Sequence, residues 1–397
     1  MIINEKILKR LVSTLSVDGA NLIVPLITLP ILTQTLGLSL YGEYLLFLMM
    51  GTFLVTIIDF GIGYIGVRKI VDCKSPELKA KIFFQFQSVR CFIFIVVSSL
   101  VFTLSQVVSY QLSVLLVCYL LGTLLFSEWY FFAFHKIKQF ALLQLSLKIS
   151  QLIFIIFFID QNSFNLLIEM TAITQLLIGV IACVLRKGYH PPTMRLSVTV
   201  VRAKQALPSF LTVLMPNSFN SLPYLYVGHF STTGEFAYYA IAHRLTSIII
   251  NIQNTITKTI FPLLTKSNYH ELKVLFRLNV MIAIPSILVC LLFGNELIKL
   301  LTGDENNNPV YLSLLVISSL FVGVTNTLMS GYYFLHGRSN QYGKIVSIIS
   351  LTSFLYTVPL IYFLDVIGCC LSLVIARLLM MSFSYLPTLQ KRQVCES

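Results

Sequence analysis

The sequence predicts an all-α membrane protein with twelve transmembrane helices, arranged in two six-helix lobes that are related by a pseudo-two-fold axis along the membrane normal. The chain has 397 residues, of which 56% are hydrophobic and 11% are charged, and its mean hydropathy is +0.84. In soluble domains roughly a quarter of the residues are charged, so this composition excludes a soluble domain. Because only helices and closed barrels satisfy every backbone hydrogen bond in lipid, long apolar stretches predict spanning helices.

Twelve stretches have the length and composition of such a helix. Their predicted limits are 11–33, 43–66, 82–105, 111–134, 140–160, 164–185, 206–230, 236–264, 275–300, 310–335, 343–364 and 366–388. The first stretch is long, contains Asp18 and is not followed by a small-residue cleavage pattern. We therefore expect it to remain as a membrane span and not to be removed as a signal peptide.

The basic residues orient these helices. Most of the 28 Lys and Arg fall into clusters, and two predicted spans lie between each cluster and the next. The clusters are at 6–10, 68–81, 136–138, 186–204, 266–277, 338–344 and 391–392. Intervening loops such as 106–110 and 160–163 carry none. The positive-inside rule then predicts a multi-pass protein with both termini in the cytoplasm. The net charge of +12 is divided among short loops, as membrane orientation requires, and we expect no binding to nucleic acid.

A repeated motif predicts the two lobes. Leu29-Pro30 is followed by Gly42-Glu43-Tyr44, and Leu222-Pro223 is followed at nearly the same spacing by Gly234-Glu235-Phe236. Six helices separate the two copies, so both enter the membrane from the same side, as in parallel repeats. Coincidence between apolar segments rich in Leu and Pro is the alternative. The predicted domains are an N-terminal lobe at 1–188, a basic cytoplasmic linker at 189–205 and a C-terminal lobe at 206–397.

Five cations lie inside the predicted spans, namely Arg90, Lys148, Arg244, Lys258 and Arg377. A Lys or Arg at the centre of a bilayer costs roughly 2.5 to 3.5 kcal/mol on insertion scales. Five such residues facing lipid would be hard to tolerate, so we expect a hydrated cavity. A cavity with excess positive charge attracts anions, and the fork of an Arg side chain matches phosphate oxygens.

The polar residues of the span at 236–264 share one face of the helix. They recur at steps of three and four, at Arg244, Ser247, Asn251, Asn254 and Lys258. The candidate substrate-binding residues are Arg90, Lys148, Arg244, Asn251, Asn254, Lys258 and Arg377. The candidate ion-coupling residues are Asp18, Asp59 and Glu128. Alternatively, the cations pair as interhelical ties with Asp18, Asp59, Glu128 and Glu169.

No catalytic residue, metal site or cofactor is predicted. The eight cysteines show neither a C-x-x-C pair nor a spacing to His that would bind metal. A membrane glycosyltransferase or polysaccharide polymerase would need a sizeable outer loop, and the predicted outer loops are short. The sequence therefore favours a transporter over an enzyme.

The opening of the chain resembles a known family. Asn21-x3-Pro25-x4-Pro30-x-Leu32-x3-Leu36-Gly37-x3-Tyr41-Gly42, followed by Asp59-x-Gly61-x-Gly63, is similar to the start of bacterial polysaccharide flippases. These form the Wzx-type O-antigen group of the multidrug/oligosaccharidyl-lipid/polysaccharide exporter superfamily. The resemblance implies a V-shaped pair of lobes around a cationic central cavity, in the bacterial inner membrane. It further implies that alternating access carries undecaprenyl-diphosphate-linked oligosaccharide, the O-antigen repeat unit, from the cytoplasmic to the outer leaflet.

This resemblance implies a role in lipopolysaccharide biosynthesis and a set of partners. The expected partners are the undecaprenyl-diphosphate-linked glycan and the lipid bilayer, with a proton or sodium ion as candidate coupling ion and polysaccharide polymerase machinery as candidate protein partner. A peptidoglycan-precursor flippase and a multidrug or cation antiporter of the same superfamily are the alternatives. Similar proteins often carry Glu where this chain has Arg377, so a coupling scheme borrowed from them does not transfer directly.

Overall fold

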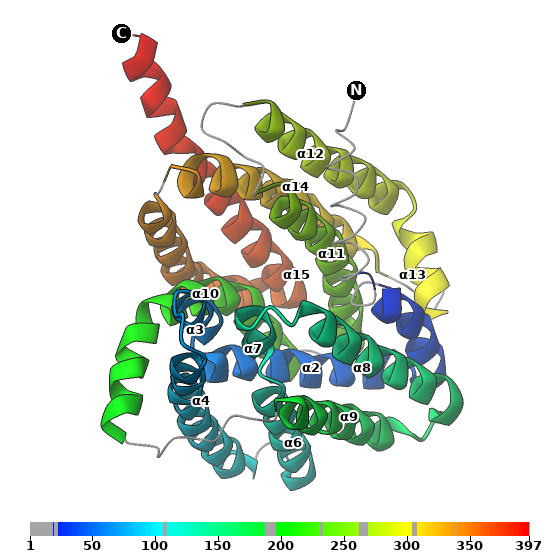
Figure 1. Cartoon of the computed structure of the whole chain (residues 1–397). Coiled ribbons are helices and arrows are strands. Elements are labelled where there is room, and N and C mark those ends of the chain that lie inside the picture. The colour runs from blue at the N-terminus through cyan, green and yellow to red at the C-terminus, as the bar shows by residue number, and fades with distance from the viewer. Residues whose placement is uncertain are drawn as a thin grey trace. The chain divides into compact units, whose positions relative to one another are not determined.

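The computed structural model describes residues 19, 23–105, 109–186, 196–230, 233–261, 269–303, 308–336 and 338–396. These residues are almost entirely α-helical and contain no strand, which confirms the predicted all-α class. The chain divides into two compact units (Figure 1). Unit 1 contains the residues up to Glu43 and from Ser218 onward, and unit 2 contains Tyr44–Asn217. Two helices run from one unit into the other, α2 (Leu38–Asp59) and α10 (Leu196–Phe230).

Unit 2 is built on close helix packing. Besides its parts of α2 and α10 it contains α3 (Ile62–Val71), α4 (Pro76–Thr103), α6 (Tyr110–Phe126), α7 (Glu128–Ala133), α8 (Ile137–Phe158) and α9 (Phe164–Leu185). Helices α6 and α9 lie side by side (Figure 1) because glycines face each other at their crossing. A Cβ added to Gly179 would lie 2.3 Å from the carbonyl oxygen of Gly122. Small residues let membrane helices approach this closely.

The core of unit 2 is aromatic. Phe83, Phe86, Trp129, Tyr130 and Phe131 are all buried, and they gather where α4 meets α7. The rings of Phe83 and Trp129 lie 4.8 Å apart, and the ring of Tyr130 meets Phe83 edge-on at 5.2 Å. Such ring pairs add to the free energy of burial, so this end of unit 2 provides a rigid base for the side chains around it.

Unit 1 contains the apolar helix Ile23–Leu36 and the helices that follow α10. These are α11 (Thr233–Ile260), α12 (Tyr269–Leu292), α13 (Gly294–Thr302), α14 (Val310–Leu328), the π-helix η2 (Met329–Phe334) and α15 (Ser339–Glu396). Helix α14 packs against α11, α12 and α15. Asp365, with φ 49° and ψ −125°, interrupts α15 at the residue that separates the predicted spans 343–364 and 366–388.

Eight helices of the described residues are long and apolar enough to cross a membrane. The last of them, Asn340–Tyr385, contains both of the spans that Asp365 separates. The predicted spans at 206–230 and 236–264 lie in the helices α10 and α11, which are not among the eight. Their Pro, Asn, Ser, Thr and charged residues lower the hydropathy. The first predicted span lies partly outside the described residues, and its end forms the shorter apolar helix Ile23–Leu36.

Two predicted spans are interrupted in the structure. The span at 43–66 breaks after Asp59, because Phe60 and Gly61 have φ values of 46° and 66°. The left-handed Gly61 also lies against the backbone of α10, where a Cβ would come within 2.4 Å of the Phe210 nitrogen. The span at 111–134 breaks at Ser127, whose φ is 45°. The helix is interrupted at both points, although Tyr110–Ala133 still has the length and composition of one membrane span. Residues 196–205 of the predicted linker are helical and belong to α10.

Candidate functional site

The predicted site residues belong to both units. Arg90, Lys148, Asp59 and Glu128 lie in unit 2, while Arg244, Asn251, Asn254, Lys258 and Arg377 lie in unit 1. Asp18 lies outside the described residues.

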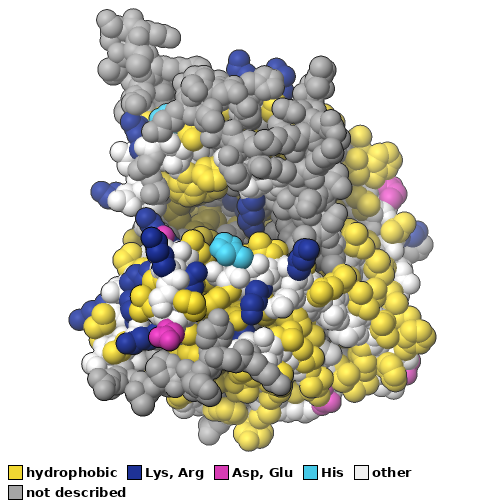
Figure 2. Space-filling view, in the orientation of Figure 1, with side chains coloured by type: hydrophobic (Ala, Val, Ile, Leu, Met, Phe, Trp, Pro, Cys, Tyr) yellow, Lys and Arg dark blue, Asp and Glu magenta, His cyan; other side chains and the backbone are white. Residues whose placement is uncertain are grey.

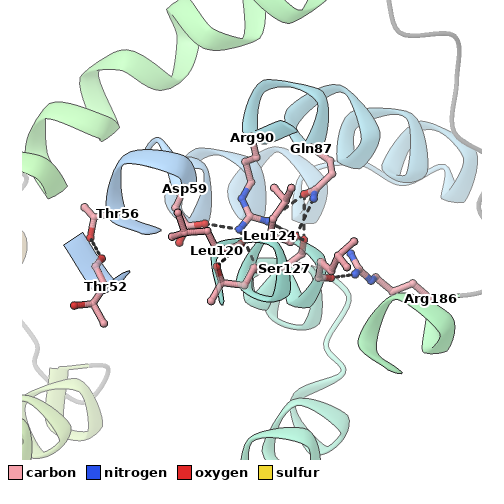
Figure 3. A network of polar contacts seen from close by, with 11 residues as sticks. Thr52, Thr56, Asp59, Gln87, Arg90, Leu120, Leu124, Ser127 and Arg186 are labelled. Carbon is pink, nitrogen blue, oxygen red and sulfur yellow. Dashed lines mark hydrogen bonds and ion pairs between the residues drawn. The ribbon is translucent and has the colours of Figure 1, made fainter. Parts of the chain in front are cut away.

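Arg90 lies at the centre of a polar network in unit 2 (Figure 3). Its side chain is only 3% exposed, and one Nη atom lies 2.5 Å from a carboxylate oxygen of Asp59. The other Nη donates to the Ser127 hydroxyl at 2.7 Å and to the Gln87 side-chain oxygen at 3.2 Å. The guanidinium also donates to the carbonyl oxygens of Thr123 and Leu124. Arg90 therefore joins α4 to the end of α2 and the end of α6.

The break at Ser127 explains why the network forms there. Helix α6 ends at Phe126, so its last carbonyl groups have no partner within the helix. The C-terminus of a helix carries partial negative charge, and Arg90 meets it with a cation. Asp59, the last residue of α2, supplies a full negative charge from a side chain that is 46% exposed. The interhelical tie that the sequence left open as an alternative therefore exists between Arg90 and Asp59, and a role of Arg90 in substrate binding stays a prediction.

Arg377 has surroundings of a different kind in unit 1. It lies on α15 and is 9% exposed. One Nη donates to the hydroxyl of Ser318 on α14 at 2.6 Å, and the other donates to the side-chain oxygen of Asn220 on α10 at 3.2 Å. Among the described residues, no carboxylate pairs with Arg377. Its positive charge is therefore held in place by two neutral groups.

Arg377 and Arg244 both act electrostatically on one aromatic cluster of unit 1. The rings of Tyr224, Tyr239 and His243 form a cluster in which Tyr224 is 5.2 Å from His243 and 5.4 Å from Tyr239. Arg244 and Arg377 both interact electrostatically with His243. Unit 1 thus brings two of the predicted cations, Arg244 and Arg377, to the same aromatic cluster.

The polar face predicted for α11 is the more accessible side of that helix. Asn251 and Lys258 are exposed, and Arg244 and Asn254 are half-buried. The side-chain oxygen of Asn254 accepts a hydrogen bond of 2.8 Å from Asn326 on α14. These positions place polar side chains along one accessible side of α11.

A buried amide pair on the opposite side of α11 was not predicted. Gln253 and Asn279 are both fully buried, and Gln253 donates to the Asn279 carbonyl oxygen at 3.2 Å. Asn279 donates to the Thr327 hydroxyl at 3.3 Å. Gly323 makes room for them, since a Cβ there would lie 2.8 Å from the Gln253 nitrogen. Gln253 precedes Asn254 in the sequence, and the helical period alone shows that it must face the other way.

The remaining candidates have less distinctive surroundings. Lys148 is half-buried on α8, and Glu128 is exposed in the first turn of α7. Their predicted roles in substrate binding and in ion coupling stay predictions.

An apolar groove of about 390 Å³ lies close to the Arg377 site in unit 1. Helices α10 and α15 form it, with Phe219, Leu222, Phe354 and Ile361 among the lining residues. Phe219 is the chain neighbour of Asn220, which holds Arg377. One helix segment therefore contacts both the cation and the groove.

Two relatives extend over nearly the whole chain. A putative O-antigen transporter of Shigella dysenteriae is 21% identical over 390 residues, which cover 94% of this chain and 98% of the relative. A putative O-antigen transporter of Escherichia coli K12 is 23% identical over 410 residues, which cover 96% of each chain. Both relatives are named as transporters, in agreement with the prediction of a transporter and not an enzyme.

Solved structures show the same fold. A lipid II flippase, MurJ, in an inward closed conformation has a TM-score of 0.74 at 16% identity, with 95% of this chain and 87% of that chain covered. An inward-facing multidrug transporter of the MATE family has a TM-score of 0.69 at 13% identity, with 96% and 95% covered. The family model described as "Polysaccharide biosynthesis protein" matches residues 7–268. Since this match exceeds half of the chain and agrees with the resemblance of the opening motif to polysaccharide flippases, the chain belongs to this polysaccharide biosynthesis family.

Proposed function

We propose that this protein is a flippase that moves a lipid-diphosphate-linked oligosaccharide of the O-antigen type from the cytoplasmic to the outer leaflet of a bacterial inner membrane. Membership of the polysaccharide biosynthesis family and the names of the two relatives support a glycan cargo. The observation that carries the proposal is Arg377, a buried guanidinium held by Ser318 and Asn220 and, within the described part of the chain, not by a carboxylate.

Arg377 has the chemistry to bind a diphosphate. A guanidinium carries five N–H donors, and the two neutral partners leave some of them available. Paired N–H groups match the oxygens of a phosphate, and such charge-assisted bonds are stronger than neutral ones. Arg244 supplies a second positive charge beside the same aromatic cluster. The two cations would together hold the diphosphate, while Asn251, Asn254 and Lys258 on the same face of α11 contact the sugars.

Neutral partners of Arg377 suit a transport cycle. A buried charge without a partner is unfavourable, and an anion that binds it removes that penalty. A carboxylate would compete with the substrate for the cation, whereas the side chains of Ser318 and Asn220 position it without neutralising it. Binding would therefore depend on the negative charge of the cargo, and release would leave the cation ready for the next molecule.

The lipid tail has a candidate place in the groove between α10 and α15. The groove lining is almost wholly apolar, as an isoprenoid chain requires. Its lining residue Phe219 directly precedes Asn220, which accepts a hydrogen bond from Arg377. Thr357→Trp would fill the groove, because Thr357 lines it, and should slow transport. Leu351→Trp is the matched control on the same helix, since Leu351 is 59% exposed and does not line the groove.

The finer architecture is part of the proposal. We infer twelve spans in two six-helix repeats, cytoplasmic termini and alternating access. The break at Asp365 supports separate eleventh and twelfth spans. Gly42 and Phe236, from the two copies of the repeated motif, are in contact, since a Cβ on Gly42 would lie 3.5 Å from the Cδ1 atom of Phe236. A proton or sodium ion would drive the cycle, with Asp18 and Glu128 as candidate coupling residues beside Asp59, and polymerase machinery would take up the product.

The proposal is tested by deleting the gene and measuring which leaflet holds the lipid-linked oligosaccharide. Deletion should trap it in the cytoplasmic leaflet, and wild-type protein should restore export. Arg377→Met, which keeps much of the side-chain volume, should fail to restore export although the protein is folded and inserted. Lys344→Ala is the control, because Lys344 is an exposed cation on the same helix. Full export with Arg377→Met would refute the site, and accumulation of a peptidoglycan precursor would identify the other type of flippase.

A further inference from the structure

A second cationic site lies in unit 2, apart from the Arg90 network. Figure 2 shows Lys and Arg side chains gathered over the part of unit 2 that α3, α7 and the start of α8 form. Within this basic region, Lys69 on α3 and Arg202 on α10 meet around α4. The positive-inside rule accounts for cations at this end of the helices, but it does not require that any of them be held in a defined geometry.

Lys69 and Arg202 are held by the same neutral groups. The Nζ of Lys69 donates to the side-chain oxygen of Gln205, and an Nη of Arg202 donates to that same oxygen at 2.9 Å. The Nε and the other Nη of Arg202 donate to the side-chain oxygen of Gln85 at 3.0 and 2.6 Å. Both cations also lie over the ring of the buried Phe86, at 5.8 and 5.4 Å from its centroid.

Among the described residues, the two positive charges have no acid to neutralise them, and they contact amide oxygens and an aromatic ring. Burial and the charge of Arg202 lower the pKa of Lys69. Two like charges that share one acceptor repel each other, yet both side chains are fixed and both retain unused N–H donors. This arrangement is typical of an anion site. A bound phosphate would offset the repulsion between Lys69 and Arg202 and accept a charge-assisted hydrogen bond from each of them.

We propose that Lys69 and Arg202 together bind the phosphate group of a membrane lipid. Gln205 accepts hydrogen bonds from both cations, Gln85 accepts from Arg202, and both cations lie over the ring of Phe86. The site lies in unit 2 and uses none of the residues assigned to the glycan cargo. The phosphate can come from an anionic phospholipid or from a polyprenyl diphosphate, and both present the same oxygens to the site.

The test measures lipid binding to the full-length protein, purified in a neutral detergent, by native mass spectrometry. Dioleoyl phosphatidylglycerol and undecaprenyl diphosphate are titrated in separate arms. Lys69→Gln and Arg202→Gln should each weaken binding by about tenfold, the size expected for one charge-assisted hydrogen bond. Arg68→Gln and Lys204→Gln are the matched controls, because they remove exposed cations from the same two helices, and they should change the affinity less than about twofold.

Each outcome bears on the proposal. A loss in the phosphatidylglycerol arm identifies a phospholipid site, and a loss confined to the undecaprenyl diphosphate arm assigns the site to the carrier lipid. An equal loss in all four variants would show that general surface charge attracts the lipid, and it would overturn the proposal. Unchanged affinity in Lys69→Gln and Arg202→Gln would overturn it as well.

Gln205→Glu separates binding from folding. It places a carboxylate between Lys69 and Arg202, where both already donate to the same side-chain oxygen. This variant should unfold at the same temperature as wild type or at a higher one, because the two charges gain an internal partner. It should nevertheless bind the lipid phosphate about tenfold more weakly. Wild-type affinity in Gln205→Glu would show that the cations do not bind the phosphate.

Discussion

Replacing Asp59 by Asn should destabilise unit 2 by about 1–3 kcal/mol, because it leaves the charge of Arg90 without its acid. Removing one partner of a fully buried ion pair costs about 3–5 kcal/mol, whereas exposed pairs contribute about 1 kcal/mol or less. The Arg90 side chain is 3% exposed and that of Asp59 is 46% exposed, so this pair lies between the two cases. The remaining hydrogen bonds to Ser127 and to the end of α6 keep the loss below the fully buried limit.

The measurement is a double-mutant cycle. The free energy of unfolding is obtained from titration with SDS in mixed micelles for wild type, Asp59→Asn, Arg90→Met and the double variant. Arg90→Met should cost more than Asp59→Asn, because it leaves several acceptors of the network without a donor. The double variant should cost little more than Arg90→Met alone, since the half-exposed Asp59 can turn to water. The coupling energy should therefore be about 1–3 kcal/mol.

Thr56→Ala provides the control for this cycle. Thr56 lies on the same helix as Asp59, is accessible, and donates to the carbonyl oxygen of Thr52. Its replacement should change the free energy of unfolding by less than about 0.5 kcal/mol. A coupling energy between Asp59 and Arg90 that is no larger than about 0.5 kcal/mol would refute the claim that Asp59 neutralises the buried cation.

Further predictions concern two glycines and a lysine. Gly61→Ala should cost at least about 1–3 kcal/mol in the same SDS titration, because it places a left-handed alanine whose Cβ would lie 2.4 Å from the Phe210 nitrogen. Gly63→Ala is the control: a Cβ there would meet nothing within 4 Å, so the change should be neutral or slightly stabilising. Gly179→Ala should separate α6 from α9 and reduce thermal stability, because its Cβ would meet Gly122 at 2.3 Å. The pKa of Lys69 is lowered from 10.5, so the folded state binds fewer protons than the unfolded state just below that pH. Wild type should therefore gain stability relative to Lys69→Met as the pH rises toward 10.5, and a falling difference would contradict this sign.

The helical class could be predicted because it depends on composition and on the length of apolar stretches, which are local properties. The break at Asp365 was also predictable, since a charged residue separates two apolar stretches there. The break at Ser127 was not, because no Gly or Pro marks it and its left-handed backbone is stabilised by contacts with Arg90. Arg90 and Ser127 are 37 positions apart, and helical periodicity carries no information over that distance.

The candidate site was predictable to the same limited extent. Steps of three and four residues identified the accessible face of α11 from the sequence. Periodicity within one helix cannot identify the acid or amide that another helix places beside a cation. Gln85 and Arg202 are 117 positions apart, so the sequence pattern could not show that they are in contact. They are therefore absent from the predicted site.

The contrast between Arg90 and Arg377 shows why burial of a cation does not by itself identify a binding site. Both are buried, at 2% and 9% exposure, and the same membrane penalty applies to both. Arg90 contacts an acid and the C-terminus of a helix, so its charge stabilises the fold. Arg90→Lys should therefore reduce stability, because the point charge of Lys cannot replace the several hydrogen bonds of the guanidinium. Arg377 meets two neutral side chains, so Arg377→Lys should keep the fold and part of the transport activity. We expect Arg377→Met to lose transport without losing stability, and Arg90→Met to lose both. This difference would separate a cation that binds cargo from one that holds helices together.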